Sequence, residues 1–310
     1  FWPSFEIYGG VSGFIDLGPL GTVMKRRIVQ KWLDTFIKKH GFLEISTPVI
    51  TPERVFQASG HVDHFKDSMV ECLNCKRRFK ADHLLREAAG IQAEAFSLEQ
   101  IERTINDRQI RCVECGGQLS KPDYFSTMFR TTTGPYSEAV AYGRPEAAQG
   151  MFVDFKRVYE ASREKMPIAI AQVGTALRNE ISPRQGPIRL REFTIMEFEF
   201  FYDPAEPSCP YINEVKGNEI RILPLQLRNK GIEEPITATI RQVLDEKLVL
   251  SEWFAYFMGL SQQFMLDLGV PLARQRFHEK LPSERAHYSS QTYDHEVWLD
   301  RWGWVEMAGH

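Results

Sequence analysis

The chain has 310 residues, 43% hydrophobic and 25% charged, an ordinary globular composition that excludes wholesale disorder or a fibrous repeat. With 38 Lys and Arg against 41 Asp and Glu, the net charge of −3 does not point to nucleic acid, although a local basic patch would be enough to bind it. No apolar run approaches the roughly 18 residues of a membrane span. The first residues lack a signal-peptide pattern, so we expect a cytoplasmic protein without a membrane partner.

Residues 1–70 are expected to form the first part of the main domain. A helix is predicted to begin after Gly21 and to end at Gly41, because apolar residues recur at helical spacing before a basic last turn. That apolar stripe consists of Val29, Leu33, Phe36 and Ile37. A strand is predicted over residues 42–45, before Pro48.

Four of the five cysteines form two Cys-x-x-Cys pairs, Cys72 with Cys75 and Cys112 with Cys115. Each pair brings two thiolates to one tight turn, and two such turns supply the four ligands of a tetrahedral zinc site. Reduced structural cysteines and disulfides are the alternatives, although the doubled pattern is typical of zinc. We therefore predict a zinc-binding insertion over residues 71–123. Within it, a capping box at Ser97 and Gln100 indicates a short helix.

Residues 124–203 are predicted to contain two long strands, 169–180 and 190–202, joined by a loop rich in proline and glycine. Side chains on a strand alternate between two faces, so one face of this hairpin mixes charged and aromatic groups. These groups are Arg178, Glu180, Phe193, Glu197 and Glu199. A guanidinium for phosphate, a stacking ring and carboxylates for an amine suit a ligand-binding floor. A solvated sheet face with cross-strand ion pairs is the alternative.

The remaining residues are predicted to form an insertion, 204–285, that is helical from about 234 to 269, and then a return to the main domain over 286–310. Strands and helices come in blocks and do not alternate strictly, so we predict an α+β fold with a mixed, mainly antiparallel sheet flanked by helices. Trp304 and Glu306 share a face of the last strand. Taken alone, this pattern favours a core strand with one exposed acidic residue over a ligand-binding strand.

Together these motifs resemble a class II aminoacyl-tRNA synthetase, specifically a glycyl-tRNA synthetase of the dimeric, archaeal and eukaryotic-like kind. The helix and strand before Pro48 are similar to class II motif 1, and residues 178–193 are similar to motif 2. Residues 144–150 resemble the family's Arg-Pro-Glu-Thr-Ala-Gln-Gly signature, 79–83 its Phe-Arg-Ala-Asp-His segment, and 303–309 its glycine-pocket strand. The resemblance covers nearly the whole chain and implies a class II catalytic core with an inserted zinc-knuckle subdomain.

The chain departs from the family pattern at several positions. Ala147 replaces the usual Thr, and Leu177 stands where class II enzymes often carry Phe. Lys80 replaces an Arg that contacts substrate in relatives, and the two are not equivalent at a bidentate site. Motif 3 and the anticodon-binding domain do not occur in these 310 residues, so we expect a partial catalytic domain.

The resemblance implies that Arg178 is the catalytic residue, bridging the α-phosphate of ATP and the glycine carboxylate. Glu180 would accept from the adenine amino group, Phe193 would stack on adenine, and Arg189 and Arg191 would hold the triphosphate. The full set expected at ATP is Arg178, Asn179, Glu180, Ile188, Arg189, Leu190, Arg191, Glu192, Phe193, Glu306 and Met307. Mg²⁺ would bridge the phosphates, and Arg184 would touch phosphate or the tRNA end.

Glycine has no side chain to grip, so the family must select its charges and exclude anything larger. The expected glycine set is Lys80, Glu146, Phe193, Thr194, Ile195, Met196, Glu197 and Glu306. The implied reaction joins glycine to ATP as an adenylate and then transfers it to the 3′ end of tRNA(Gly). The implied assembly is a homodimer through motif 1.

Three other interpretations stay open. The first is a catalytically inactive, synthetase-like accessory protein that binds nucleic acid, but the presence of Arg178, Glu180 and Phe193 argues against it. Another class II synthetase, for serine, threonine or proline, is disfavoured by the three predicted pocket acids. A zinc-knuckle nucleic-acid module would account for only a small part of the chain.

Overall fold

A computed structural model of the chain describes residues 1–93, 96–136, 138–183, 186–286 and 289–310, so Arg184 of the predicted loop tip lies outside the described residues. The chain divides into two compact units. Unit 1 comprises Phe1–Val29, Phe42–Lys165 and Ala169–Phe200, and unit 2 comprises Gln30–Gly41, Met166–Ile168 and Phe201–His310. Among the described helices, none combines the length and the apolar character needed to cross a membrane.

The predicted first helix is present as α1, Pro19–Trp32, and continues through a π-helical turn, Leu33–Ile37, and a 3-10 turn, Lys38–His40. Gly41 ends it with a φ of 70°, a left-handed conformation that costs little without a Cβ. Leu33, Phe36 and Ile37 of the predicted stripe are buried. Within unit 2 the Phe36 ring meets Phe264 edge-on, with ring centroids 5.7 Å apart. Most of the stripe therefore packs into the core of its own chain.

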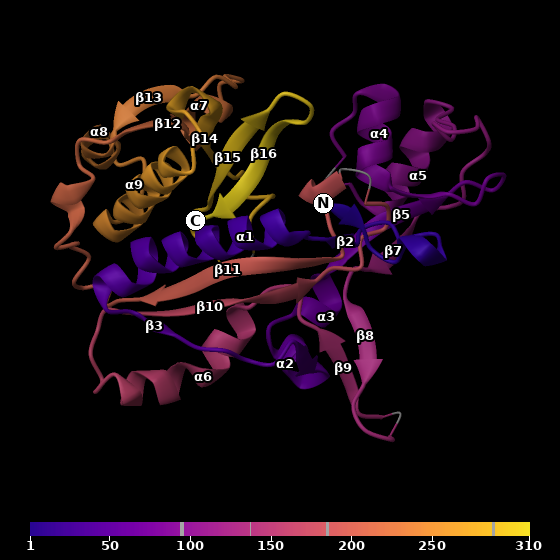
Figure 1. The fold of residues 1–310 in the computed structure, drawn as a ribbon. Helices are drawn as coiled ribbons and strands as arrows, with labels where there is room; N and C mark the ends of the chain where they lie inside the picture. The colour runs from indigo at the N-terminus through magenta and orange to yellow at the C-terminus, as the bar shows by residue number, and fades with distance from the viewer. Residues whose placement is uncertain (94–95, 137, 184–185, 287–288) are drawn as a thin grey trace. The chain divides into compact units, whose positions relative to one another are not determined.

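Unit 1 contains three three-stranded sheets, with the orders β11-β10-β3, β4-β9-β8 and β6-β5-β7, and a small β1–β2 pair. β3 pairs with β10 in parallel. The pairs β1–β2, β4–β9, β8–β9, β5–β6 and β5–β7 are antiparallel. The strands are β1 Trp2–Pro3, β2 Ile15–Asp16, β3 Leu43–Glu44, β4 Ile50–Pro52, β5 Lys66–Glu71, β6 Arg78–Lys80, β7 Asp123–Ser126, β8 Phe129–Thr132, β9 Val140–Gly143, β10 Ile168–Leu177 and β11 Glu192–Phe201. Figure 1 shows β10 and β11 running side by side as the longest strands of this unit.

The helices of unit 1 include α2 Glu53–Ala58, α3 His61–His64, α4 Ala81–Ala89, α5 Leu98–Asp107 and α6 Ala148–Ala161. The predicted capping box begins α5: the Gln100 N–H donates to Ser97 Oγ at 3.2 Å, and the Ser97 N–H donates to Gln100 Oε1 at 2.8 Å. Helices α4 and α5 share a buried cluster with the β5–β6 hairpin, which includes Val70, Phe79, Leu84 and Ile101 (Figure 1). The cysteine-bearing segment thus has an apolar core of its own.

Unit 2 is built on one five-stranded sheet with the order β13-β12-β14-β15-β16, in which β12 and β14 are parallel and the other pairs are antiparallel. Its strands are β12 Glu219–Leu223, β13 Ile236–Thr239, β14 Gln275–Glu279, β15 Tyr293–Leu299 and β16 Gly303–Gly309. Its helices are α7 Leu225–Arg228, α8 Ile240–Asp245 and α9 Glu252–Asp267. Helix α9 buries most of its length, from Trp253 to Phe264.

One sequence expectation differs from this sheet. We expected residues 204–285 to be an insertion separate from residues 286–310, but β15 and β16 pair with β14 in the sheet that also holds β12 and β13. The backbone hydrogen bonds of β15 are satisfied on both sides inside this sheet, by β14 and β16. Residues 234–269 are mostly helical, as expected, through α8 and α9, although Ile236–Thr239 within this range is a strand. Its run of β-branched residues favours the extended backbone.

Candidate functional site

The two strands of the predicted hairpin are present, and their ends position the charged residues between them. β10 ends at Leu177 and β11 begins at Glu192, so Arg178 and Glu180 lie just beyond the strand. The backbone still pairs there, because the Arg178 N–H donates to the Arg191 carbonyl at 2.9 Å. The Asn179 N–H donates to the Thr127 carbonyl at 2.7 Å. This backbone pairing holds the Arg178 side chain in place.

The Arg178 guanidinium lies between aromatic and acidic groups. Its Nε donates to the Pro145 carbonyl at 3.1 Å, and its central carbon lies 5.4 Å from the ring centroid of Phe193 and 5.8 Å from that of Phe65. These distances are typical of cation–π contacts. The stacking ring and the phosphate-binding cation expected from the sequence are therefore adjacent. Phe65 gave no sequence signal, because it lies far from Arg178 along the chain.

Arg178 opens into a cavity of about 280 Å³. Four of the predicted site residues, Lys80, Arg178, Glu180 and Arg189, line it together with His64, Phe65, Lys66, Asp67 and Thr127. Cations and carboxylates of the cavity form ion pairs. Lys80 Nζ lies 3.1 Å from Asp67 Oδ1 and 3.4 Å from Asp82 Oδ2, and Arg189 Nη1 lies 3.9 Å from Glu180 Oε2. Asp67 was not predicted, because nothing in the sequence connects β5 with the β10–β11 loop. The cavity can hold a ligand that carries both anionic and hydrogen-bonding groups.

A second cavity, of about 270 Å³, shares Asp67, Lys80, Glu180 and Arg189 with the first. It extends along α4, where His83, Leu84, Arg86 and Glu87 line it. Burial lowers the pKa of His83 to about 4, so this imidazole is neutral at physiological pH. The shared walls make the two cavities neighbouring parts of one charged depression in unit 1.

Two of the predicted acids, Glu146 and Glu197, lie near Arg178. Glu146 accepts hydrogen bonds from Gln149 Nε2 at 2.6 Å and lies 3.1 Å from His61 Nε2. Burial raises the pKa of Glu146, but these hydrogen bonds and the charges of His61 and Arg178 outweigh it, so the net shift is downward. Burial and the negative charge of Glu146 raise the pKa of Glu197 to about 7, although the Ala147 N–H donates to it at 2.7 Å. At neutral pH the pair therefore combines an ionised acid with one poised near half-ionisation.

Glu199 follows Glu197 on the same face of β11 and belongs to the same acidic group. Burial, together with the charges of Glu197 and Glu146, raises its pKa to about 7. The sequence placed it on this face, but we did not include it among the expected glycine contacts. Two partly buried carboxyl groups on one face of β11, with the carboxyl group of Glu146 close enough to act on both, favour a cationic ligand.

Two of the signature residues 144–150, Arg144 and Gly150, have structural roles. Arg144 is buried, and its guanidinium donates to the Thr175 carbonyl at 2.8 Å and the Thr47 carbonyl at 3.1 Å. It therefore ties β10 to the chain segment after β3. Gly150 lies inside α6, where a Cβ would overlap the Thr47 side chain. Its role is a close approach of the helix to Thr47.

Other predicted residues lie elsewhere in the fold. Arg191 donates to the Glu180 carbonyl at 2.8 Å and the Ser12 carbonyl at 2.7 Å, so its guanidinium holds backbone. The other predicted residues of this segment are Ile188 in a 3-10 turn, Leu190 before β11, and Glu192, Thr194, Ile195 and Met196 on β11; Glu192 is exposed, and the rest are partly buried. Glu306 and Met307 lie on β16 of unit 2, where Glu306 is the cross-strand partner of Glu296.

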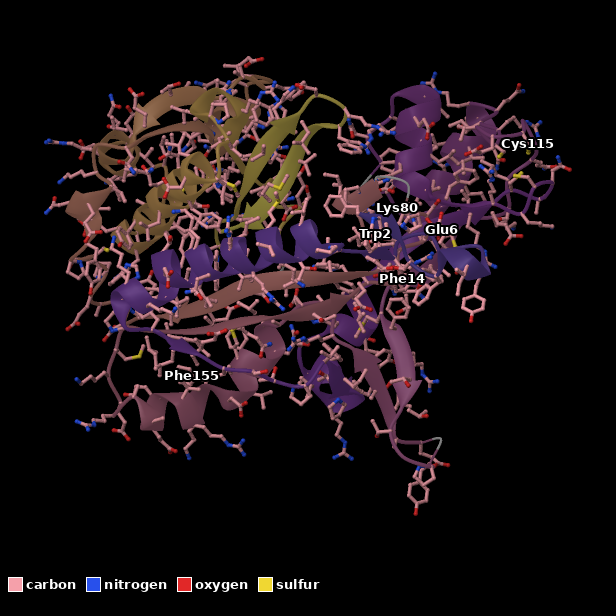
Figure 2. All side chains as sticks on the ribbon, viewed as in Figure 1. Trp2, Glu6, Phe14, Lys80, Cys115 and Phe155 are labelled. Carbon is pink, nitrogen blue, oxygen red and sulfur yellow. The ribbon has the colours of Figure 1, made fainter. Side chains whose placement is uncertain are left out.

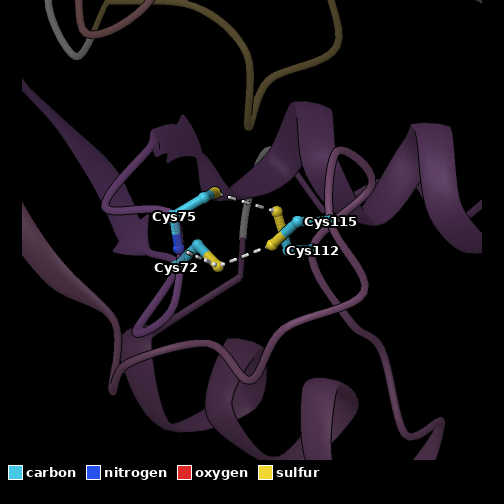
Figure 3. A group of neighbouring side chains, drawn as sticks. All are labelled: Cys72, Cys75, Cys112 and Cys115. Atoms are coloured by element: carbon cyan, nitrogen blue, oxygen red, sulfur yellow. Dashed lines mark hydrogen bonds between the residues drawn. The ribbon is translucent and has the colours of Figure 1, made fainter.

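The four cysteines of the two Cys-x-x-Cys pairs meet at one point (Figure 3). Their Sγ atoms all lie within 4.8 Å of one another, with Cys72 to Cys115 at 3.5 Å and Cys75 to Cys112 at 3.7 Å. A tetrahedron with zinc–sulfur bonds of about 2.3 Å has edges of about 3.8 Å, so the cluster has the size of a zinc site. The structure contains no disulfide among the described cysteines, which sets aside that alternative for this geometry.

The two turns that carry the cysteines have matching backbones. In each, the residue after the second cysteine has a left-handed φ, 60° at Lys76 and 70° at Gly116. The Lys76 N–H donates to the Cys72 carbonyl at 3.0 Å, and the Gly116 N–H donates to the Cys112 carbonyl at 2.8 Å. A Cβ on Gly117 would lie 2.7 Å from Asn74 Cβ and 3.0 Å from Cys72 Sγ, so only glycine fits. Figure 2 shows Cys115 at the far side of the inserted segment from Lys80.

Comparison with known proteins identifies the relatives of the chain. A glycine–tRNA ligase from Aeropyrum pernix is 51% identical over 100% of this chain, and one from Pyrococcus furiosus is 49% identical over 99%. One from Methanocaldococcus jannaschii is 40% identical over 99% of the chain. The chain is homologous to archaeal glycine–tRNA ligases. It spans about half the length of these relatives, 54% of each.

This glycine–tRNA ligase homologue was also compared with protein-family models and with solved structures. No protein-family model matches the chain. A prolyl-tRNA synthetase from Giardia lamblia, solved with prolyl-adenylate, matches 96% of this chain and 40% of its own, with a TM-score of 0.51 and 14% identity. At that identity the likeness concerns the fold alone, and it agrees with the predicted class II core.

The acidic face of β11 predicts a pH dependence of stability. A carboxyl whose folded pKa is raised takes up protons on folding, so its contribution to stability is lost as pH rises from its ordinary value near 4.5 to about 7. We expect Glu199→Gln to flatten this decline, because the amide carries no charge at any of these pH values. Urea unfolding at pH 5 and pH 8 measures it, with exposed Glu246→Gln as control. A decline as steep in Glu199→Gln as in the parent would contradict the assignment.

Proposed function

We propose that this chain carries the glycine-activating site of a glycine–tRNA ligase. The observation that supports it is the meeting of Arg178, Glu180, Arg189 and Lys80 around one cavity, with Glu146 and Glu197 beside Arg178. These residues come from four separate segments of the chain. Homology to glycine–tRNA ligases along nearly every residue supports the same assignment.

The first step would join the glycine carboxylate to the α-phosphorus of ATP, with pyrophosphate leaving. A carboxylate is already ionised at neutral pH, so the attack needs no strong general base. Catalysis is then a matter of positioning and of stabilising the charge that develops at phosphorus. Arg178 suits both tasks, because a guanidinium can hold a carboxylate and a phosphoryl oxygen at once, and Pro145 and Phe193 already fix its orientation.

ATP would occupy the cavity with its adenine toward Phe193 and Glu180. Arg189 and Lys80 line the same cavity and would meet phosphate oxygens. Asp67 and Glu180 are oxygen donors of the kind that Mg²⁺ prefers, so the cavity fits the metal that accompanies ATP. When bound, Mg²⁺ would supply charge neutralisation at the phosphates. Arg191, whose guanidinium holds the Glu180 carbonyl, would position Glu180 for the adenine amino group.

Glycine would be selected by the acids near Arg178. Glu146 and Glu197 would receive its ammonium group, with Lys80 as a further expected contact of the glycine site. An entering ammonium favours the ionised form of Glu197, so glycine binding would release a proton when the pH lies below about 7. Substrates larger than glycine would be excluded by Phe193 and Ile195, which share the face of β11 that carries Glu197.

The second step would transfer glycine to the 3′ end of tRNA(Gly), the second substrate of a ligase of this kind. The protein would act in the cytoplasm, where a reducing environment keeps a cluster of four thiols available for a metal. A catalytically inactive accessory protein has no need for the buried acids beside Arg178, whose burial costs stability. The activating enzyme is therefore the better conclusion.

We propose further that Cys72, Cys75, Cys112 and Cys115 bind one structural zinc ion. The sulfur–sulfur distances and the close fit of Gly117 support a closed four-sulfur site. Cys72 and Cys112 also lie in the buried cluster of the inserted segment, so the metal would stabilise that cluster. Since Lys80 lies within this segment, at the end of β6, the zinc would stabilise one wall of the cavity.

We propose that the protein is a homodimer that uses α1. The stripe expected at the interface is buried in its own chain, so other residues of α1 must supply the contact. Leu20, Val23 and Met24 are exposed, Leu20 by 86% and Met24 by 64%. Large apolar side chains grouped on one exposed helix are typical of an interface.

The dimer is tested with Leu20→Asp combined with Met24→Asp. Buried charges without partners would weaken self-association, so sedimentation at micromolar concentration should show the parent as a dimer and the variant as a monomer. Ile232→Asp, at an exposed apolar residue of unit 2, serves as control and should stay dimeric. A parent protein that sediments only as a monomer would contradict the proposal.

The activation step is tested with Arg178→Ala. Removing a charge-assisted contact to the reacting phosphoryl group should lower glycine-dependent ATP–pyrophosphate exchange by roughly 10²–10³-fold. Arg157→Ala, an exposed arginine on α6, should retain the parent rate. Near-parent exchange in Arg178→Ala would show that the cavity beside Arg178 is not the activating site.

The zinc site is tested by metal analysis of protein purified without added zinc, which should contain about one equivalent. Cys112→Ser should lose the metal and unfold at a lower temperature, because a four-ligand site loses a ligand inside a buried core. Cys209→Ser, at a buried free cysteine outside the cluster, should keep the metal. Parent protein without zinc, whose four cluster thiols all titrate freely, would refute the site.

A further inference from the structure

His61, the first residue of the short helix α3, contacts the acid that the proposed function assigns to the glycine ammonium. Its Nε2 atom lies 3.1 Å from Glu146 Oε1. Both side chains are largely shielded from solvent, with exposed fractions of 13% for His61 and 23% for Glu146. An ionised carboxylate can only accept hydrogen bonds, so Nε2 must carry the hydrogen. His61 therefore donates to Glu146 whether its ring is neutral or charged.

The other contacts of His61 fix the orientation of its ring. Nδ1 lies 2.9 Å from Ser59 Oγ, a hydroxyl that can either donate or accept. This partner suits the neutral ring and the imidazolium alike. The ring also stacks on Phe65, with centroids 5.5 Å apart and planes at 22°, and its centroid lies 5.8 Å from that of the buried Phe56. These contacts determine the direction in which Nε2 donates.

The two oxygens of Glu146 are used unequally. Gln149 Nε2 donates to Oε1 at 2.6 Å, so His61 and Gln149 bind the same oxygen. Among the residues that the structure describes, none makes a hydrogen bond to Oε2. A carboxylate held through one oxygen can accept from a ligand at the other, and an ammonium is the donor that its charge favours. The two donors thus hold the carboxylate without occupying its ligand-binding oxygen.

The charged groups around Glu146 come from three parts of unit 1. His61 approaches from α3, Arg178 from the end of β10, and Glu197 and Glu199 from β11. Burial raises the pKa of Glu146, and the hydrogen bond from His61 is the strongest influence that lowers it. Without this donor the carboxyl group would take up a proton more readily, and a protonated acid attracts an ammonium less strongly.

We propose that His61 is a positioning residue for glycine: its hydrogen bond to Glu146 Oε1 holds that carboxylate so that Oε2 receives the substrate ammonium. This role rests on the proposed function, because it concerns the support of the same glycine site. His61 acts through Glu146 and does not itself touch the substrate. A histidine that only filled the space beside Phe56 and Phe65 would affect stability and leave glycine affinity unchanged.

The test measures glycine-dependent ATP–pyrophosphate exchange in the parent and in variants of α3. His61→Phe keeps a ring against Phe65 but has no donor. Losing a hydrogen bond to a charged group should raise KM for glycine by about 10-fold, while kcat changes much less. His61→Gln, whose amide can donate from nearly the position of Nε2, should return KM close to the parent value. Asp63→Asn, at an exposed residue of the same helix, should match the parent.

A double-mutant cycle in urea unfolding at pH 7 tests the contact without substrate. His61→Phe should cost less stability in a Glu146→Gln background than in the parent, because the charged acceptor is already absent there. Equal costs in the two backgrounds would show that His61 only fills space. His61→Leu, which also lacks a donor, replaces His61→Phe if that variant does not fold.

The outcomes separate this role from the proposed function. Parent KM in His61→Phe, in a protein with intact exchange, would overturn the inference and leave the proposed function standing. A KM raised equally in His61→Gln and His61→Phe would also overturn it, by assigning the effect to packing. Absence of exchange in the parent would refute the proposed function and, with it, the role of His61 toward glycine, whereas the cycle would still report the contact with Glu146.

Discussion

The placement of the Arg178 guanidinium is the constraint on which the rest of unit 1 depends. Pro145 accepts its hydrogen bond, Phe65 and Phe193 lie beside it, and its charge acts on Glu146 and Glu197. Carboxyl groups can be buried near one another only where a cation or hydrogen bonds offset the cost. β10, β11 and the loop before α6 must therefore meet at one place. Arg144, buried behind them, holds that meeting point by hydrogen bonds to backbone carbonyls.

The two acids beside Arg178 are both partly buried, but their pKa values shift in opposite directions. Both lose solvation, but Glu146 receives hydrogen bonds from His61 and Gln149, whereas Glu197 receives one from the Ala147 backbone. The first acid stays ionised, and the pKa of the second rises to about 7. Such a pair is prepared for a cation without carrying two full buried charges in its absence. This arrangement suits an amino acid that offers only an ammonium and a carboxylate for recognition.

The inserted segment, residues 71–123, forms part of the cavity wall although it is only a small subdomain. Its buried cluster is limited, and two of the buried members are Cys72 and Cys112. A small core gains much from a cross-link by metal or disulfide. The four Sγ atoms have the spacing of a tetrahedral metal site. The matched left-handed turns at Lys76 and Gly116 direct them toward one point. The segment then presents β6 and α4, with Lys80 between them, to the cavity.

The sequence by itself determined the parts whose information is local. Helical spacing and Gly41 defined the first helix, and Ser97 and Gln100 defined the start of α5. Strand alternation put Arg178, Phe193 and Glu197 on one hairpin, and the doubled Cys-x-x-Cys pattern indicated the cluster of four cysteines. Resemblance to glycyl-tRNA synthetases supplied the family. Tertiary structure alone decided which distant segments meet. It brought Phe65 and Asp67 to Arg178 and turned the Arg191 guanidinium onto backbone. It also joined residues 286–310 to β12 and β13 in one sheet. The reason is physical: spacing along a chain encodes which side of an element a residue faces, whereas the partner it meets there depends on how hydrogen bonds and burial are satisfied across the whole fold.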